Sequence, residues 1–85
     1  MAKIVLDVAK LRMWRAYRGL TKHKMSQLMG YTGDGYYYIE SGKVVPSLAR
    51  INQICEILDI SPLDILAIED EKKKEGEHEN ISEVR

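Results

Sequence analysis

The sequence predicts a small all-α domain made of five short helices. Apolar residues recur three and four positions apart, which is the spacing that lines one face of a helix. Asp, Thr and Ser residues that can cap a helix N-terminus stand before these runs. The connections are only a few residues long, so successive helices are expected to pack against one another. At 85 residues the chain forms one domain, and a domain of this size is marginally stable without a partner subunit.

The first helix is expected over residues 8–18. Asp7 is a suitable N-cap, apolar residues follow it at helical spacing, and Gly19 can end the helix. The segment before it, residues 1–6 with the sequence MAKIVL, is apolar and contains two β-branched residues. It is therefore either an N-terminal arm or a short strand, and the sequence leaves both alternatives open.

The second and third helices are expected over residues 21–29 and 33–40, separated by a tight turn at Gly30. Thr21 and Thr32 are the expected N-caps of these two helices. Glycine adopts the backbone angles of a sharp turn at little steric cost, which is why Gly30 marks the turn.

The fourth helix is expected to begin after the cap Ser47, because a stripe of apolar residues at helical spacing follows. Ser61 and Pro62 have the favoured order for a helix start, so a fifth helix is expected over residues 62–68. This helix would carry more apolar surface than one short helix buries by itself. Residues 69–85 are charged and poor in apolar side chains, and we expect a frayed helix end followed by a flexible tail.

The composition excludes several classes of function. The net charge is zero, but residues 1–68 carry +3 and residues 69–85 carry −3. The chain has one cysteine and two histidines far apart, so we expect no disulfide framework, no metal site, no cofactor and no enzyme activity. Apolar runs are too short to span a membrane, and no signal peptide is evident. We therefore expect a cytoplasmic protein without a membrane partner.

Several residues between helices one and four have a joint spacing that is typical of a known family. They are Gly19, Leu20, Thr21, Ser26, Gly30, Ile39, Glu40, Gly42, Lys43, Pro46 and Ser47. With this pattern, residues 8–66 resemble the lambda-repressor-like helix-turn-helix domain, the Cro/cI or XRE family of bacterial and phage transcriptional regulators. The resemblance implies a five-helix lambda-repressor-like DNA-binding domain over residues 7–68. It also implies a structural ion pair between Arg15 and Glu40 beneath the third helix.

The resemblance implies that the third helix is a recognition helix that enters the DNA major groove. The DNA-binding residues that it implies are Lys22, Thr32, Gly33, Asp34, Tyr37, Tyr38 and Lys43. Weaker candidates for phosphate contacts are Arg18, Lys24 and Arg50. Lysine suits a phosphate as a point charge, and tyrosine can donate its hydroxyl to a phosphate or lay its ring against a thymine methyl group.

The outward face of the recognition helix departs from the family pattern. Gly33 stands where studied relatives carry a base-reading glutamine or arginine, and it has no side chain with which to read a base. Asp34 has two interpretations: an acid in the first turn favours the helix dipole, or its carboxylate accepts a bond from cytosine N4. Direct base readout is therefore expected to be weak, and readout of DNA shape remains the alternative.

The sequence predicts a sequence-specific transcriptional regulator, in the role of a repressor, that binds double-stranded operator DNA as a homodimer through the fifth helix, with residues 1–6 as a candidate for a further contact. The alternative is a protein-interaction module on the same fold, such as an antitoxin or a phage regulatory partner. In that case the tyrosine face would grip a protein, because tyrosine is favoured at interface centres. The acidic tail is a second expected contact for a protein partner.

Overall fold

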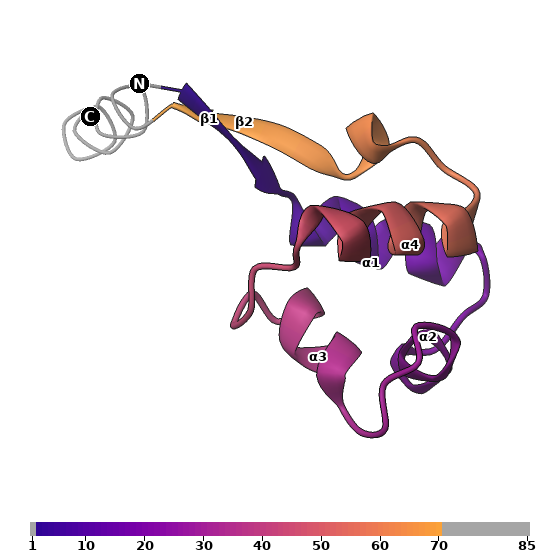
Figure 1. Cartoon of the computed structure of the whole chain (residues 1–85). Helices are drawn as coiled ribbons and strands as arrows, with labels where there is room; N and C mark the ends of the chain where they lie inside the picture. Colours follow the sequence, from indigo (N-terminus) through magenta and orange to yellow (C-terminus); the bar gives the residue numbers. More distant parts are fainter. Residues whose placement is uncertain (1, 71–85) are drawn as a thin grey trace, which may run out of the picture.

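The computed structural model describes residues 2–70, which form four α-helices, one short 3-10 helix and a two-stranded sheet (Figure 1). In chain order the elements are β1 (Ala2–Leu6), α1 (Val8–Tyr17), α2 (Lys22–Leu28), α3 (Gly35–Glu40), α4 (Leu48–Leu58), the 3-10 helix η1 (Pro62–Asp64) and β2 (Leu66–Asp70). Within this range, every helix is too short or too polar to cross a bilayer.

The elements lie in three levels. In Figure 1, α1 and α4 cross the middle of the domain, and α2 and α3 lie on one side of them. The ribbon of β1 and β2 lies on the opposite side and extends past the ends of the helices. The α2–α3 pair and the ribbon are therefore separated by the layer of α1 and α4.

The expected N-caps of α1, α2 and α4 are confirmed, and Ser61 caps η1 as expected. The Asp7 carboxylate accepts the backbone N–H groups of Ala9 and Lys10 at 3.1 and 3.2 Å, and starts α1. The hydroxyl of Thr21 starts α2 and the hydroxyl of Ser47 starts α4, each by accepting the N–H three residues later. Each cap satisfies a donor that has no partner within its own helix, which is worth about 1 kcal/mol.

The prediction of a five-helix, all-α fold is wrong: of the two alternatives left open for residues 1–6, the short strand is found as β1, and the C-terminal end of the domain lacks the fifth helix. The expected fifth helix, residues 62–68, is replaced by the single turn η1 and then by β2. Strand β2 pairs antiparallel with β1, so that Leu6 faces Leu66 and Ala2 faces Asp70. A seven-residue helix is marginal by itself, whereas a strand at this place satisfies its backbone groups on a distant partner.

The boundary expected for the charged tail is also corrected. Glu69 and Asp70 were expected to begin the tail, but they are the last residues of β2. The remainder of that expected tail, residues 71–85, lies outside the described residues. Pairing across the ladder brings Lys3 Nζ within 4.0 Å of Glu69 Oε1, which gives Glu69 a place in the ribbon.

The core is built where the helices meet under the ribbon. Its buried apolar side chains are Leu11, Met25, Met29, Tyr36, Ile39, Ile54, Cys55, Leu58 and Ile65. The core contains residues from every α-helix of the described range, so the four helices are fixed relative to one another. Burial raises the pKa of the Cys55 thiol, which favours the inert, packed role that a small core residue has.

Candidate nucleic-acid interface

The turn between α2 and α3 begins at Gly30, which has a φ of 86°. A side chain is strained at this angle, so glycine suits the position. The N–H of Gly30 donates to the carbonyl of Gln27, and the N–H of Tyr31 donates to the carbonyl of Ser26 at 2.9 Å. These two bonds end α2 and direct the chain toward α3.

Helix α3 begins two residues later than expected, at Gly35. Thr32 was the expected cap, but Asp34 takes the N-cap position, and its side chain makes no capping bond. The hydroxyl of Ser26 on α2 accepts the buried N–H of Tyr36 at 3.2 Å. Ser26 therefore satisfies a first-turn donor of α3 from a neighbouring helix, which alanine at this position could not do.

Tyr31 lies over the start of α3 and leaves no room for a side chain on Gly35. A Cβ atom added to Gly35 would lie 2.6 Å from Cγ of the Tyr31 ring. The guanidinium of Arg50, from α4, lies over the Tyr31 ring, 4.4 Å from its centroid. Contact through Gly35, Tyr31 and Arg50 thus joins α3 to α4.

Arg50 also holds the end of α2. Its Nη1 atom donates to the carbonyl of Met29 at 2.9 Å and to Oε1 of Gln53 at 2.8 Å. Gln53 donates to the same Met29 carbonyl at 3.3 Å. Arg50 was a weak candidate for a phosphate contact, but the structure commits its guanidinium to positioning α2 and the turn.

The expected ion-pair residues, Arg15 and Glu40, lie in contact beneath α3. Arg15 Nε donates to Glu40 Oε2 at 2.7 Å and Arg15 Nη2 donates to Glu40 Oε1 at 3.0 Å. Glu40 is 2% exposed, and the hydroxyl of Tyr36 donates to its Oε2 at 2.7 Å. The Tyr36 contact was missed, although the spacing of four residues on one helix is a signal for it.

These contacts move three pKa values in consistent directions. Burial alone would raise the pKa of Glu40, but the hydrogen bonds from Arg15 and Tyr36 outweigh burial and lower it. Burial and the bond to Glu40 raise the pKa of Tyr36, and the bond to Glu40 raises the pKa of Arg15. All three groups therefore hold the ionisation states that the network needs: carboxylate, phenol and guanidinium.

The lowered pKa of Glu40 predicts a loss of stability in acid. Glu40 contributes its full stabilisation above the ordinary glutamate pKa of about 4.3, and this contribution is lost as pH falls through the lower folded pKa. The free energy of unfolding, measured in urea between pH 6 and pH 2.5, should fall more steeply for the native chain than for Glu40→Gln. Parallel curves for the two proteins would contradict this prediction.

The other candidates lie on the outer side of α2 and α3. Thr32, Gly33 and Asp34 lie in the turn before α3, not on the helix, and all three are exposed. Tyr37 and Tyr38 are on α3 and are 37% and 47% exposed, in contrast to the fully buried Tyr36. The three consecutive tyrosines thus divide into one core residue and two surface residues.

Each surface tyrosine has a lysine over its ring. Lys22 Nζ, at the start of α2, lies 5.5 Å from the ring centroid of Tyr37. Lys43 Nζ, just after α3, lies 5.8 Å from the ring centroid of Tyr38. A cation over an aromatic face is stabilised by about 0.5–1 kcal/mol at an exposed site. The two pairs place two positive charges beside the exposed tyrosines of α3.

The remaining weak candidates, Arg18 and Lys24, differ in their surroundings. Arg18 donates from Nε to the carbonyl of Leu58 at 2.7 Å and from Nη2 to that of Asp59 at 3.2 Å, at the end of α4. Lys24 is exposed on α2. Arg18 is therefore a structural residue, whereas Lys24 stays a candidate for a phosphate contact.

A known protein family covers most of the chain. Residues 8–67 match the helix-turn-helix domain. Searches among curated proteins and among solved structures gave no match. The family match agrees with the resemblance to Cro/cI or XRE regulators, and the chain belongs to the helix-turn-helix domain family. Separately, within residues 2–70 no group of three or more His, Cys, Asp or Glu side chains is placed to hold a metal ion.

Proposed function

We propose that the protein is a sequence-specific transcriptional regulator that binds operator DNA through the major groove, in the cytoplasm and without catalytic activity. The observation that carries the proposal is the pair of lysine–tyrosine contacts at α3, in a chain of the helix-turn-helix family. Lysines at such positions reach the phosphate backbones that border a groove, while the helix between them meets base edges.

The proposed contacts divide by chemistry. Lys22 and Lys43 bind phosphates, and their ammonium groups are held in place by the tyrosine rings. Thr32 donates its hydroxyl to a phosphate, and Gly33 permits close approach of the backbone because it has no side chain. Tyr37 and Tyr38 offer ring edges and hydroxyls to bases and sugars.

Asp34 is the proposed determinant of sequence preference. Its side chain is exposed and makes no capping bond, so the carboxylate is available to a partner. A carboxylate accepts a hydrogen bond from cytosine N4 in the major groove and is repelled by phosphates. This combination favours a cytosine at one position and disfavours non-specific binding.

The proposed regulator is a homodimer that acts as a repressor. Two recognition helices one DNA turn apart, about 34 Å, would read the two halves of a near-palindrome. The expected interface, a fifth helix, does not exist in the described residues, because β2 occupies that part of the chain. The dimer therefore needs a different surface.

Selection from random duplexes tests the function directly. The full chain is mixed with a random double-stranded library at two salt concentrations, and the bound sequences are determined. An enriched motif of two related half-sites, with affinity that falls steeply with salt, supports a sequence-specific regulator. Binding without sequence preference, or no binding, rejects it. Capture of one stoichiometric protein that no longer binds Tyr37→Ala would instead favour the protein-interaction module, in which the tyrosine face grips a protein.

The phosphate role of the lysines predicts a change in salt dependence. Lys22→Ala and Lys43→Ala should each weaken binding to all sequences and make the slope of log K against log salt less steep by about 1.8 for the dimer, because each subunit loses one phosphate contact worth about 0.9. Lys10→Ala, which removes the same charge from the exposed start of α1, is the matched control and should leave the slope unchanged. An equal slope for all four proteins would contradict the assignment.

A further inference from the structure

Strand β1 pairs with β2 along one edge, and within residues 2–70 no other strand pairs with its second, open edge. The N–H of Asp7 donates to the carbonyl of Ile65 at 2.8 Å, which makes these two residues a hydrogen-bonded pair of the antiparallel ladder. Partners alternate along such a ladder. Val5 therefore turns its N–H and C=O toward β2, whereas Ile4 and Leu6 turn theirs to the opposite edge.

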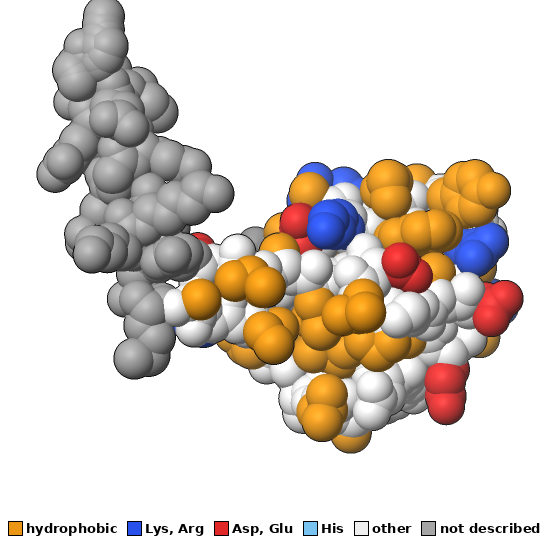
Figure 2. All heavy atoms as spheres, turned by 90° about the horizontal axis from the view of Figure 1, so that it is seen from above, with side chains coloured by type: hydrophobic (Ala, Val, Ile, Leu, Met, Phe, Trp, Pro, Cys, Tyr) orange, Lys and Arg blue, Asp and Glu red, His pale blue; other side chains and the backbone are white. Residues whose placement is uncertain are grey.

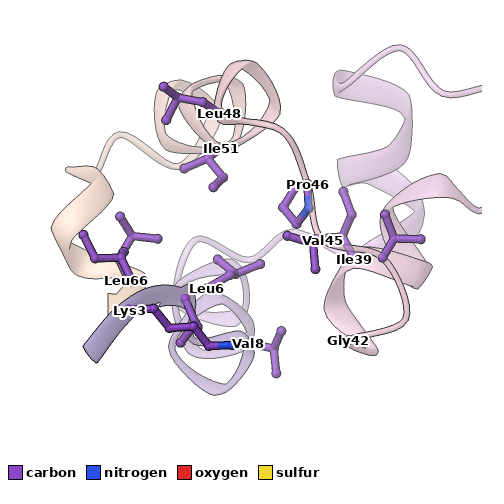
Figure 3. Close-up of a pocket in the computed structure, with 13 residues that line it drawn as sticks. Lys3, Leu6, Val8, Ile39, Gly42, Val45, Pro46, Leu48, Ile51 and Leu66 are labelled. Carbon is purple, nitrogen blue, oxygen red and sulfur yellow. The ribbon is translucent and has the colours of Figure 1, made fainter. Parts of the chain in front are cut away.

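A groove of about 620 Å³ runs along this open edge. Residues 3–6 of β1 line it together with Leu66 of β2, so the groove extends from one face of the ribbon to the open edge of β1. Figure 3 shows Leu48 and Ile51 of α4 across from Leu6, and Val45 beside Pro46 in the segment after α3. The far wall is therefore apolar.

Large apolar side chains around the ribbon are exposed. Val45 is 89% exposed, Ile68 74%, Ile4 71% and Leu48 70%. Figure 2 shows hydrophobic side chains gathered over the face that carries the ribbon. Val44, which also lines the groove, is 48% exposed, and Leu63, which lines a neighbouring hollow with Ile4 and Ile68, is 79% exposed.

The strand itself is suited to pairing with an identical strand. A two-stranded sheet is marginal in water and gains stability from a third strand. The single charge of β1, on Lys3, lies 4.0 Å from Glu69 of β2, so the ribbon balances this charge internally. An approaching copy of β1 therefore meets little repulsion and an apolar wall.

We propose that a second copy of this chain fills the groove, with its β1 paired antiparallel to the first across a two-fold axis. The result is a four-stranded sheet in the order β2, β1, β1, β2. In the proposed register, Ile4 of one copy pairs with Ile4 of the other, and Ala2 of each copy pairs with Leu6 of the other. This register gives a hydrogen-bond partner to every backbone N–H and C=O group that β1 turns away from β2. Isologous pairing of this kind closes at a dimer. The inference rests on the proposed function, since it supplies the dimer that reads two half-sites.

The open edge can be blocked without breaking the ladder. Ile4→Pro removes an N–H that points away from β2, so β1–β2 pairing should persist. Ile68→Pro is the matched control, because Ile68 faces Ile4 in the ladder and its N–H points to the outer edge of β2. In sedimentation equilibrium without DNA, the native chain and Ile68→Pro should be dimers, and Ile4→Pro a monomer. A dimeric Ile4→Pro with native helix content, or a monomeric native chain, overturns the proposal.

A second variant decides the matter if Ile4→Pro fails to fold. Leu48→Glu changes the far wall of the groove at an exposed position in the first turn of α4, where an acidic residue favours the helix dipole. It should remain folded and raise the dimer dissociation constant at least about tenfold, equal to about 1.4 kcal/mol. An unchanged dissociation constant would show that the groove lies outside any dimer interface.

Cross-linking tests the register. Ile4→Cys should form a disulfide between copies under mild oxidation, since Cα atoms of a hydrogen-bonded pair lie about 5.5 Å apart. Ile68→Cys should not, and Cys55 is buried. Cross-linking of Ile68→Cys alone would move the interface to β2 and overturn the proposal. These measurements use no DNA, so a dimer that selects no DNA motif would reject the regulator and leave the interface standing.

Discussion

Glu40→Ala should lower the free energy of unfolding by about 3–5 kcal/mol, the range for removing one partner of a buried ion pair. The change leaves Arg15, whose side chain is 13% exposed, without its carboxylate, and it leaves the buried hydroxyl of Tyr36 without an acceptor. For a domain of this size the melting temperature should fall by at least about 12 °C. Urea and thermal unfolding followed by circular dichroism measure both quantities.

We attribute most of the stability lost in Glu40→Ala to the unpaired charge of Arg15, and a double variant tests this. Replacing both charges, in Arg15→Met/Glu40→Met, removes the stranded cation and should be much less destabilising than Glu40→Ala alone. Tyr36→Phe removes a single hydrogen bond to a charged group and should cost about 1–3 kcal/mol. A Glu40→Ala protein within about 1 kcal/mol of the native chain would show that the network adds little to stability.

Gly35→Ala should destabilise the domain by about 1–3 kcal/mol, as overpacking does, even though Gly35 lacks a positive φ. Where the backbone allows alanine, this exchange normally stabilises a protein by about 0.4–1 kcal/mol. Here the new methyl group would meet the Tyr31 ring, 2.6 Å from Cγ, and push it away from Arg50. The sign of the change in unfolding free energy therefore shows whether Tyr31 is held tightly between Gly35 and Arg50.

The sign should reverse in two controls. Gly33→Ala adds a methyl group with no atom within 4 Å, so it should be neutral or stabilising. Gly35→Ala in a Tyr31→Ala background should also be neutral or stabilising, because the ring is gone. The free energies of unfolding in urea are measured for the native chain, for Gly35→Ala, for Tyr31→Ala and for the double variant. Together these four proteins complete a double-mutant cycle. A stabilising Gly35→Ala in the native background would mean that the ring moves aside without loss.

The parts of the fold that the sequence predicts correctly are those governed by local rules. The caps Asp7, Thr21 and Ser47 and the turn at Gly30 depend on a few neighbouring residues, and all four are found. The sheet was missed because β1 and β2 stabilise each other from opposite ends of the domain's sequence. Ser61 starts a helix-like turn as expected, but the conformation of the next residues depends on their pairing with β1.

For the candidate interface too, some features could be predicted from the sequence and others could not. Lys22 and Lys43 could be named from the family pattern, but their places over Tyr37 and Tyr38 required the structure. Nothing in the sequence joins Arg50 to Tyr31, because the two residues lie far apart in the chain. Side chains that position the recognition helix from outside it are therefore the part that periodicity and capping rules miss.

The separation of β1 and β2 along the chain also affects how the protein is made. Synthesis produces β1 before the four described α-helices, and β2 becomes available only after them. During that interval the strand that carries Ile4 and Val5 has no native partner on either edge, which is the condition under which apolar strands aggregate. Closing the ribbon joins residues about sixty positions apart, which closes a longer loop than the contacts between the helices and costs more chain entropy. We therefore expect the two strands to pair after the helices have packed.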